Sequence, residues 1–274
     1  MATAQRAQLL LPHLPENEEL TAEIHLILGQ AYLAGRDYTL AREHANEAFG
    51  WVRHYSPHHI LLIELLGMLA HHEGQHEEAC HYYQQAIALQ QQTGYTTYHH
   101  RTLNQLILAL QAREEWAEAH TISHQLIAHL RQTDYVLELA QALLNQGAAY
   151  YGQADLANAA ERFAEAELLL QPVPREFELK GVLNNNLACV WRDRGEWALA
   201  EQFYQRSLAA YEQMGDVLRS AQVWGNMGKL FLRQNLPELA HSRLVQSLRL
   251  LATLRHNKNA QALYKEYKNL LDGL

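Results

Sequence analysis

A small residue followed twelve positions later by alanine recurs along the 274 residues of this chain, and this repeat constrains the fold more than any other feature. The spacing of twelve is the same in all six copies, whereas successive copies begin 38, 40, 40, 41 and 40 residues apart. A fixed inner spacing with a variable outer spacing indicates a rigid helical hairpin, because small residues let its two helices approach closely. The six pairs, one of which has isoleucine in place of the small residue, are Gly29/Ala41, Gly67/Ala79, Ile107/Ala119, Gly147/Ala159, Ala188/Ala200 and Gly228/Ala240.

The composition agrees with a helical protein. Hydrophobic residues make up 48% of the chain, which is typical of a globular protein, and 14 Gly with 6 Pro are too few for the many tight turns of a β-sandwich or β-barrel. The length alone suggests two domains, but repeat arrays grow without forming separate cores. We therefore predict one continuous array over residues 1–274.

The residues that flank the pairs carry a recognisable motif. First helices contain His25-x2-Leu28-Gly29-x2-Tyr32 and Trp224-x2-Met227-Gly228-x2-Phe231, and second helices contain Ala79-x3-Tyr83, Ala159-x3-Phe163, Ala200-x3-Tyr204 and Ala240-x3-Leu244. From about residue 20 to 256 this pattern resembles the tetratricopeptide repeat, W-x2-L-G-x2-Y followed by A-x3-F. No copy is complete, since the third has Ile107 for the glycine and Ser123 for the aromatic residue. The period near 40, rather than the usual one of about 34, resembles the longer repeats of kinesin light chains, cell-polarity adaptors and LuxR-type activators similar to the maltose regulator.

The resemblance implies an all-α fold, an α-solenoid in which six hairpins form a right-handed superhelix. The expected repeats are 20–56, 57–94, 98–133, 135–172, 176–214 and 216–256, followed by a capping helix over 257–274. The segment Ala7–Pro12 resembles the end of the fourth repeat, so we expect residues 1–15 to be a helix of an incomplete repeat and the chain to be a fragment of a longer array. An incomplete repeat would leave an apolar end that favours self-association through the ends of the array.

Charge and cysteine content disfavour several other classes. The formal net charge of −8 provides no basic field for nucleic acid or an anionic membrane, so we expect neither as a partner. No stretch of 18 apolar residues and no signal-peptide pattern occurs, which favours a cytoplasmic protein. Cys80 and Cys189 lie in apolar helical patterns, and we predict that both are reduced and structural.

Two positions before the small residue of a pair, the later repeats carry amides. Asn145, Asn186 and Asn226 occupy this position, and Gln105 occupies it in the third repeat. The resemblance places first helices on the concave side of the array, where such a row, joined by Asn185, would hydrogen-bond the backbone of an extended peptide, since an amide both donates and accepts. The alternative is that these amides bond the neighbouring helix of the array.

Basic residues follow one turn later on the same face. Arg192, Lys229 and Arg233 are candidates to clamp a carboxylate of a bound peptide or partner protein. The alternative is that Arg192 and Arg194 are solvated charges of a hairpin turn.

Histidine is abundant, with 17 residues, of which 15 precede residue 130. The pairs His54/His58, His72/His76 and His120/His124 have the i, i+4 spacing that can hold zinc, but none has the H-E-x-x-H order. We interpret these residues as surface polar groups and expect no metal and no other cofactor. Crowded imidazoles can also make association sensitive to pH between about 5 and 7.

The phosphate-binding, nucleophile and C-x-x-C motifs of common enzymes are absent from the sequence. We therefore predict a non-catalytic module that binds a peptide or a partner protein, and one role open to it is that of a scaffold or regulatory part of a larger signalling protein. The alternative is an effector-sensing array of a LuxR-type regulator that binds a small ligand. A helical enzyme with a histidine metal site is the weakest of the three hypotheses.

Overall fold

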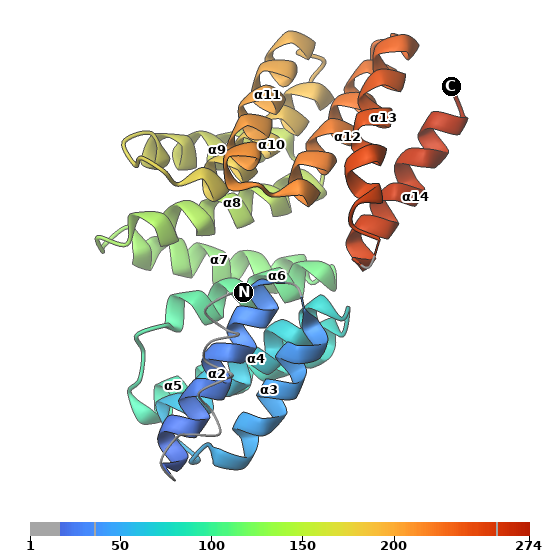
Figure 1. The fold of residues 1–274 in the computed structure, drawn as a ribbon. Helices are drawn as coiled ribbons and strands as arrows, with labels where there is room; N and C mark the ends of the chain where they lie inside the picture. Colours follow the sequence, from blue (N-terminus) through green and yellow to red (C-terminus); the bar gives the residue numbers. More distant parts are fainter. Residues whose placement is uncertain (1–16, 36, 256) are drawn as a thin grey trace. The chain divides into compact units, whose positions relative to one another are not determined.

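A computed structural model describes residues 17–35, 37–255 and 257–274 of the chain, and it confirms the predicted all-α class. Within these residues there are thirteen helices and no strand (Figure 1). The helix that the sequence predicts over residues 1–15 lies outside the described residues. The right-handed superhelix and the continuity of the array stay predictions.

The chain divides into two compact units, residues 1–129 and 130–274, and each is described by itself. The described helices of the first unit, with α7 reaching the boundary, are α2 (Glu18–Ala34), α3 (Tyr38–Trp51), α4 (Pro57–His72), α5 (His76–Thr93), α6 (His99–Ala112) and α7 (Trp116–Leu130). Those of the second are α8 (Val136–Gly152), α9 (Leu156–Leu170), α10 (Phe177–Asp193), α11 (Trp197–Met214), α12 (Val217–Arg233), α13 (Pro237–Ala252) and α14 (Lys258–Asp272). Each helix of the described residues is too short or too polar to cross a bilayer.

Helix pairing follows the repeat. Consecutive helices pack against each other in the hairpins α2–α3, α4–α5, α8–α9, α10–α11 and α12–α13, and in most of these a glycine of the first helix faces a large side chain. A Cβ atom on Gly147 would lie 2.5 Å from the ring of Phe163, and one on Gly67 would lie 2.7 Å from the ring of Tyr83. The aromatic residue of the A-x3-F motif therefore fills the space that the missing side chain leaves.

The third repeat exchanges the sizes of these two residues. Ile107 stands where the other first helices have glycine or alanine, and Ser123 stands where the second helices have an aromatic residue, leucine or, in the first repeat, Ala45. Both side chains are buried, with exposed fractions of 1% and 2%. Because cores tolerate exchanges that conserve total volume, this copy keeps its helical form without the glycine.

The turns inside the hairpins share one geometry. Five of them have three residues, of which the middle one has a positive φ: 83° for Gly74, 62° for Glu114, 61° for Ala154, 82° for Gly195 and 56° for Asn235. Glycine adopts this left-handed conformation without a steric penalty, whereas a residue with a side chain is strained there. The sequence gives no sign of this conformation at Glu114 or Ala154.

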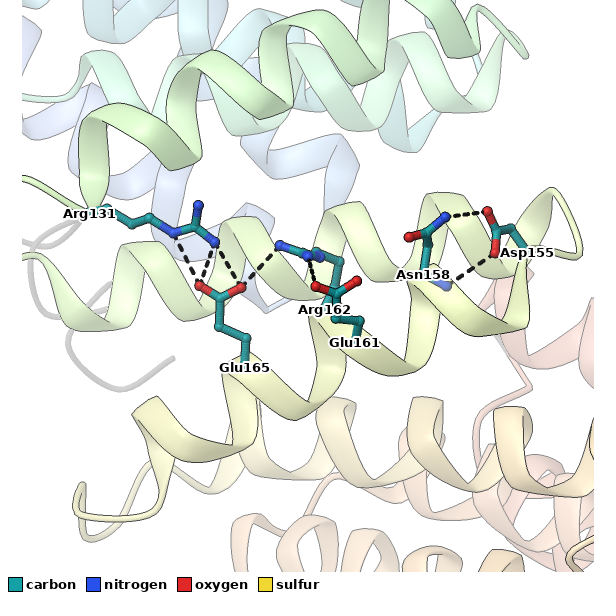
Figure 2. Close-up of polar contacts among 6 residues, drawn as sticks. All are labelled: Arg131, Asp155, Asn158, Glu161, Arg162 and Glu165. Carbon is teal, nitrogen blue, oxygen red and sulfur yellow. Dashed lines mark hydrogen bonds and ion pairs between the residues drawn. The ribbon is translucent and has the colours of Figure 1, made fainter.

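Charged and capping side chains follow one side of α9, and Figure 2 shows how they pair. Arg131 forms a forked contact with Glu165, at 2.6 and 2.9 Å, and Arg162 reaches the same carboxylate at 3.1 Å. At the start of the helix, Asp155 accepts a hydrogen bond from the backbone N–H of Asn158 and so acts as the N-cap. The charges on this side of α9 are therefore largely compensated by one another.

Gly147→Ala is expected to destabilise the α8–α9 hairpin, because its methyl group would overlap the fully buried ring of Phe163. Overpacking of this kind costs about 1–3 kcal/mol, measurable by urea unfolding. Adding Phe163→Leu should recover part of the loss, since it removes the atoms in conflict. Equal stability of Gly147→Ala and the wild type would show that the close approach is not required.

Ala154→Gly is expected to stabilise the chain by about 0.5–1 kcal/mol, because it relieves a side chain held at positive φ. Gly195→Ala is the matched reverse change at the next turn, where the added Cβ meets only an ordinary contact at 3.8 Å from Trp197. It should lower the unfolding midpoint by a similar free energy. Shifts of the same sign in both variants would contradict this interpretation.

Candidate functional site

The four predicted asparagines lie on the first helices of the second unit. Asn145 lies on α8, Asn185 and Asn186 on α10, and Asn226 on α12. Helix α10 contacts both α8 and α12, so these residues occupy successive neighbouring helices. We refer to them together as the amide row.

Three members of the amide row form hydrogen bonds inside the protein. Asn226 donates a hydrogen bond from Nδ2 to Oδ1 of Asn185 across the α10–α12 contact, at 3.0 Å. Asn145 accepts one from Nε2 of Gln141, one turn earlier on α8, at 2.9 Å. The exposed fractions of Asn145 and Asn226 are 7% and 8%. The alternative interpretation, a bond to the neighbouring helix, therefore describes Asn226.

Asn186 differs from its neighbours. It is half-buried, and its amide makes no hydrogen bond to any described residue. The preceding Asn184 instead donates to the backbone carbonyl of Lys180, at 2.6 Å. Asn186 thus retains two donors and one acceptor for another molecule. Gln105 lies on α6 in the first unit, where it too is half-buried and forms no hydrogen bond with a described side chain or backbone.

The predicted cation Arg192 is buried, with an exposed fraction of 8%, and is not a solvated residue of the turn. Its guanidinium donates to the hydroxyl of Tyr151 on α8 at 2.8 Å and to that of Tyr204 on α11 at 3.4 Å. Nε also lies 2.9 Å from the carboxylate of Asp193. Three helices are therefore joined through one guanidinium. The exposed Arg194, by contrast, donates to the backbone carbonyl of Leu156 at 2.8 Å.

Asp193 is shared by two guanidinium groups. Arg233, whose side chain is 54% exposed, lies 2.9 Å from the same carboxylate oxygen that Arg192 contacts, and the Tyr151 hydroxyl donates to the other oxygen at 2.5 Å. Burial opposes ionisation of Asp193, but the hydrogen bonds from Arg192 and Tyr151 outweigh it and lower the pKa of the carboxyl group. Arg192 and Arg233 share the one carboxylate of Asp193, which leaves an excess of one positive charge. Arg233 is the accessible member of this cluster.

Lys229 has its own carboxylate partner. Its Nζ lies 2.5 Å from Glu266 on α14 and 5.4 Å from the centre of the Tyr267 ring. The sequence pattern placed the three cations on one face but did not pair Arg192 with Tyr151, Lys229 with Glu266 or Arg233 with Asp193, because these partners come from helices about a repeat away. Tyr204 is the aromatic residue of the motif in the fifth repeat, and that signal pointed to packing rather than to a polar contact.

Both cysteines are free thiols, Cys80 buried and Cys189 partly so. Burial raises the pKa of each thiol. The Sγ atom of Cys189 lies 3.3 Å from the Tyr204 hydroxyl, next to the arginine network. Both side chains therefore stay protonated near neutral pH, as expected of structural cysteines.

A second polar network is buried in the first unit. Glu64, 3% exposed within the apolar part of α4, accepts a hydrogen bond from Gln90 of α5 at 3.2 Å and one from the hydroxyl of Thr102 of α6. Arg101 of α6 forms an ion pair with the same carboxylate at 2.5 Å. The sequence analysis missed this network, although a single carboxylate in the run Ile60–Leu69 is a visible signal.

Histidines also meet in the first unit, partly in other pairs than the spacing predicted. The ring centres of His120 and His124 are 6.3 Å apart, as expected of i, i+4 residues, but His54 meets His59 at 5.0 Å. Among the residues that the structure describes, no group of three or more histidine, cysteine, aspartate or glutamate side chains is arranged to hold a metal ion.

Paired helices in a repeat of about 40 residues, with a polar face on the first helices, define a helical-hairpin repeat protein. Residues 181–253, about a quarter of the chain, match the tetratricopeptide repeat family, in agreement with the motif in the sequence. No curated protein matches the chain by sequence.

Solved structures share the fold. In the APC/C hetero-tetramer Cut9–Hcn1, the match has a TM-score of 0.68 and 19% identity and covers 96% of this chain and 46% of the other. The complex of NprR with its cognate peptide NprX gives a TM-score of 0.71 at 14% identity, covering 97% and 76%. A Podospora anserina protein of nearly identical TPR-like repeats, described as a kinesin light chain, gives 0.57 at 15% identity, covering 75% and 100%. The chain thus spans less than half of the Cut9–Hcn1 chain that it matches.

Arg192→Met is expected to destabilise the second unit by about 2–3 kcal/mol, because it leaves buried hydroxyl groups and part of a carboxylate without their partner. Arg233→Met is the matched change at an exposed ion pair and should cost less than about 1 kcal/mol. Urea unfolding of the two variants measures the difference. Similar losses in both would mean that Arg192 does not hold the helices together.

Proposed function

We propose that the second unit binds a peptide or an extended segment of a partner protein along the amide row. The observation that carries this proposal is Asn186, whose amide has no hydrogen-bond partner among the described residues although it lies between two internally bonded asparagines in the row. An unpaired amide on a half-buried helix face can take both a carbonyl and an N–H group of an extended backbone. Asn226 has a different part, since its bond to Asn185 joins α12 to the helix that presents Asn186, whereas Asn145 is bonded to Gln141 within α8.

The neighbouring charge suggests the chemistry of the bound segment. Arg233 is the accessible member of a cluster with one excess positive charge, and it lies on α12, two turns after Asn226. An anionic side chain or a terminal carboxylate of the ligand can share the guanidinium with Asp193. Lys229 stands closer to Asn226 in sequence, but Glu266 already neutralises it.

The fold supports a binding role. The matched family and the structural neighbours are helical repeat proteins, and among them NprR is seen with its cognate peptide and Cut9 in a hetero-tetramer with Hcn1. Tetratricopeptide arrays are typically interaction modules rather than enzymes, and we extend this to the present chain. NprR is a quorum sensor, and this keeps an effector-sensing role as the second candidate, with a peptide rather than a small molecule as the effector.

Four further expectations from the sequence are also proposals. These are the LuxR-type relation, a cytoplasmic location, self-association through the ends of the array, and the absence of nucleic acid and membrane as partners. A role for Gln105 in the same row is also a proposal, because it lies in the other unit.

Selection from a display library of short random peptides tests the proposal. The wild-type chain should enrich specific peptides, and Asn186→Ala should weaken their binding about 5- to 10-fold, the loss expected for about one net hydrogen bond. Asn184→Ala is the matched control, because it makes the same change on the same helix at an amide that bonds its own backbone. Failure to enrich any peptide, or equal losses in the two variants, would contradict binding along the amide row.

The charge preference is tested with the selected peptides. Arg233→Gln should weaken binding of peptides that carry a carboxylate several-fold and leave neutral analogues unchanged, with a salt dependence that the variant loses. Titration by fluorescence anisotropy at low and high salt measures both effects. A similar loss for neutral and acidic peptides would mean that Arg233 does not select charge.

A further inference from the structure

A buried pair of imidazoles joins the first two described helices. His25 on α2 and His44 on α3 have exposed fractions of 9% and 6%, and their Nδ1 atoms lie 3.0 Å apart. This distance is that of an N–H···N hydrogen bond, so one ring donates from Nδ1 and the other accepts at Nδ1. Neither residue belongs to the i, i+4 pairs that the sequence suggested.

The packing of the hairpin holds the two rings at this distance. Gly29 and Ala41 mark the close approach of α2 and α3, and a Cβ atom on Gly29 would lie 3.5 Å from the Ala41 carbonyl oxygen and 3.8 Å from Cβ of His44. The ring of Tyr32 stacks on His44, with centres 5.4 Å apart and an angle of 6° between the planes. Ala41 and Tyr32 are both buried, so the two rings lie in a closely packed part of the hairpin.

The distance between the two Nδ1 atoms limits the number of protons that the pair can hold. The neutral pair carries one proton on each ring, and one of them lies in the shared hydrogen bond. A first added proton makes an imidazolium that still donates to a neutral partner. A second added proton places N–H groups on both Nδ1 atoms, which then point at each other across 3.0 Å with two positive charges. In this arrangement the folded hairpin therefore strongly disfavours a second added proton.

The described surroundings compensate a second charge only in part. Burial is the largest influence and lowers the pKa of both imidazoles below the ordinary value of 6.5, and His25 lowers that of His44 further, whereas Glu47 of α3 raises both and Glu43 raises that of His44. From α4, the described side chains in the core shared with this hairpin are apolar, and they include Leu62, Leu65 and Leu69. On α2 itself the neighbouring titratable group is the Tyr32 phenol.

We propose that His25 and His44 form an acid-sensitive latch, which holds α2 against α3 while the pair shares a proton and releases the hairpin when both rings become charged. Release would expose the core side chains of α2 and α3, while the second unit keeps its fold.

The direction with pH follows from the depressed pKa values. Above about 6.5 both the folded and the opened hairpin carry neutral rings, and the latch is intact. As the pH falls below this value, the opened form takes up protons that the folded form resists, so the stability of the hairpin falls. Each proton of difference raises the opening equilibrium constant about tenfold per pH unit, and two raise it about a hundredfold.

Amide hydrogen exchange of the full chain, corrected for the intrinsic rate at each pH, measures this opening. Between about pH 6.5 and 5 the protection of α2 and α3 should fall at least tenfold per pH unit in the wild type. His25→Gln/His44→Gln keeps side chains that can hydrogen-bond, and it should remove most of that dependence. His59, His71 and His99 of the same unit also have pKa values lowered by burial, so only the difference between variants isolates the pair.

His81→Gln/His124→Gln is the control, because it removes the same number of imidazoles from exposed positions of the first unit and should keep the wild-type dependence. An equal dependence in both double variants would overturn the proposal. So would an NMR titration of the wild type that shows both His25 and His44 fully protonated while α2 and α3 remain protected. If the double variant does not fold, His44→Gln alone is measured instead. Its plot of the logarithm of protection of α2 and α3 against pH should have at most half the slope of the wild type. An unchanged slope would again overturn the proposal.

Discussion

The close approach of two helices at a residue without a side chain is the interaction on which the rest of this structure depends. At Gly67 and Gly147 the vacant space is filled by the ring of the aromatic residue on the partner helix. This contact fixes the distance and the register of the two helices together, because a ring can enter the space only at one position along the hairpin. The same contact therefore also determines where the polar residues of the first helices lie. The hydrogen bond between His25 and His44 lies in the same closely packed hairpin as Gly29.

Much of this architecture could be predicted from the sequence, because it depends on local spacing. Small residues twelve positions apart predict the hairpins, and the repeat of about 40 predicts which residues share a face. What local spacing does not contain is the choice of partner across repeats. Asn226 looks identical to Asn186 in the pattern, yet one bonds Asn185 and the other bonds no described residue. Arg192 looks like a turn residue, yet hydroxyl groups from two other helices surround it.

Polar side chains therefore divide into two kinds in the second unit. Arg192 and Asn226 join neighbouring helices. They make the face of the first helices rigid and do not themselves bind a ligand. Asn186 and Arg233 stand beside them with hydrogen-bonding capacity or charge that is accessible to another molecule. A binding surface made of both kinds is preorganised, because the residues that meet the ligand lie on helices already fixed by their neighbours. The first unit has its own internal polar centre at Glu64, which serves the joining role alone.

The shared geometry of the hairpin turns bears on how arrays of this kind change in length. A turn of three residues with its middle residue at positive φ leaves no position where another residue could be added without shifting the second helix out of register. The connections between hairpins have two to six residues and the second helices have 14 to 18, so the variable outer spacing of 38 to 41 residues arises in these two parts. Insertions, new contact loops and fusion points are therefore expected in the second helices and in the joints that follow them. An array can lengthen or gain loops there while the spacing of twelve residues inside each hairpin stays the same.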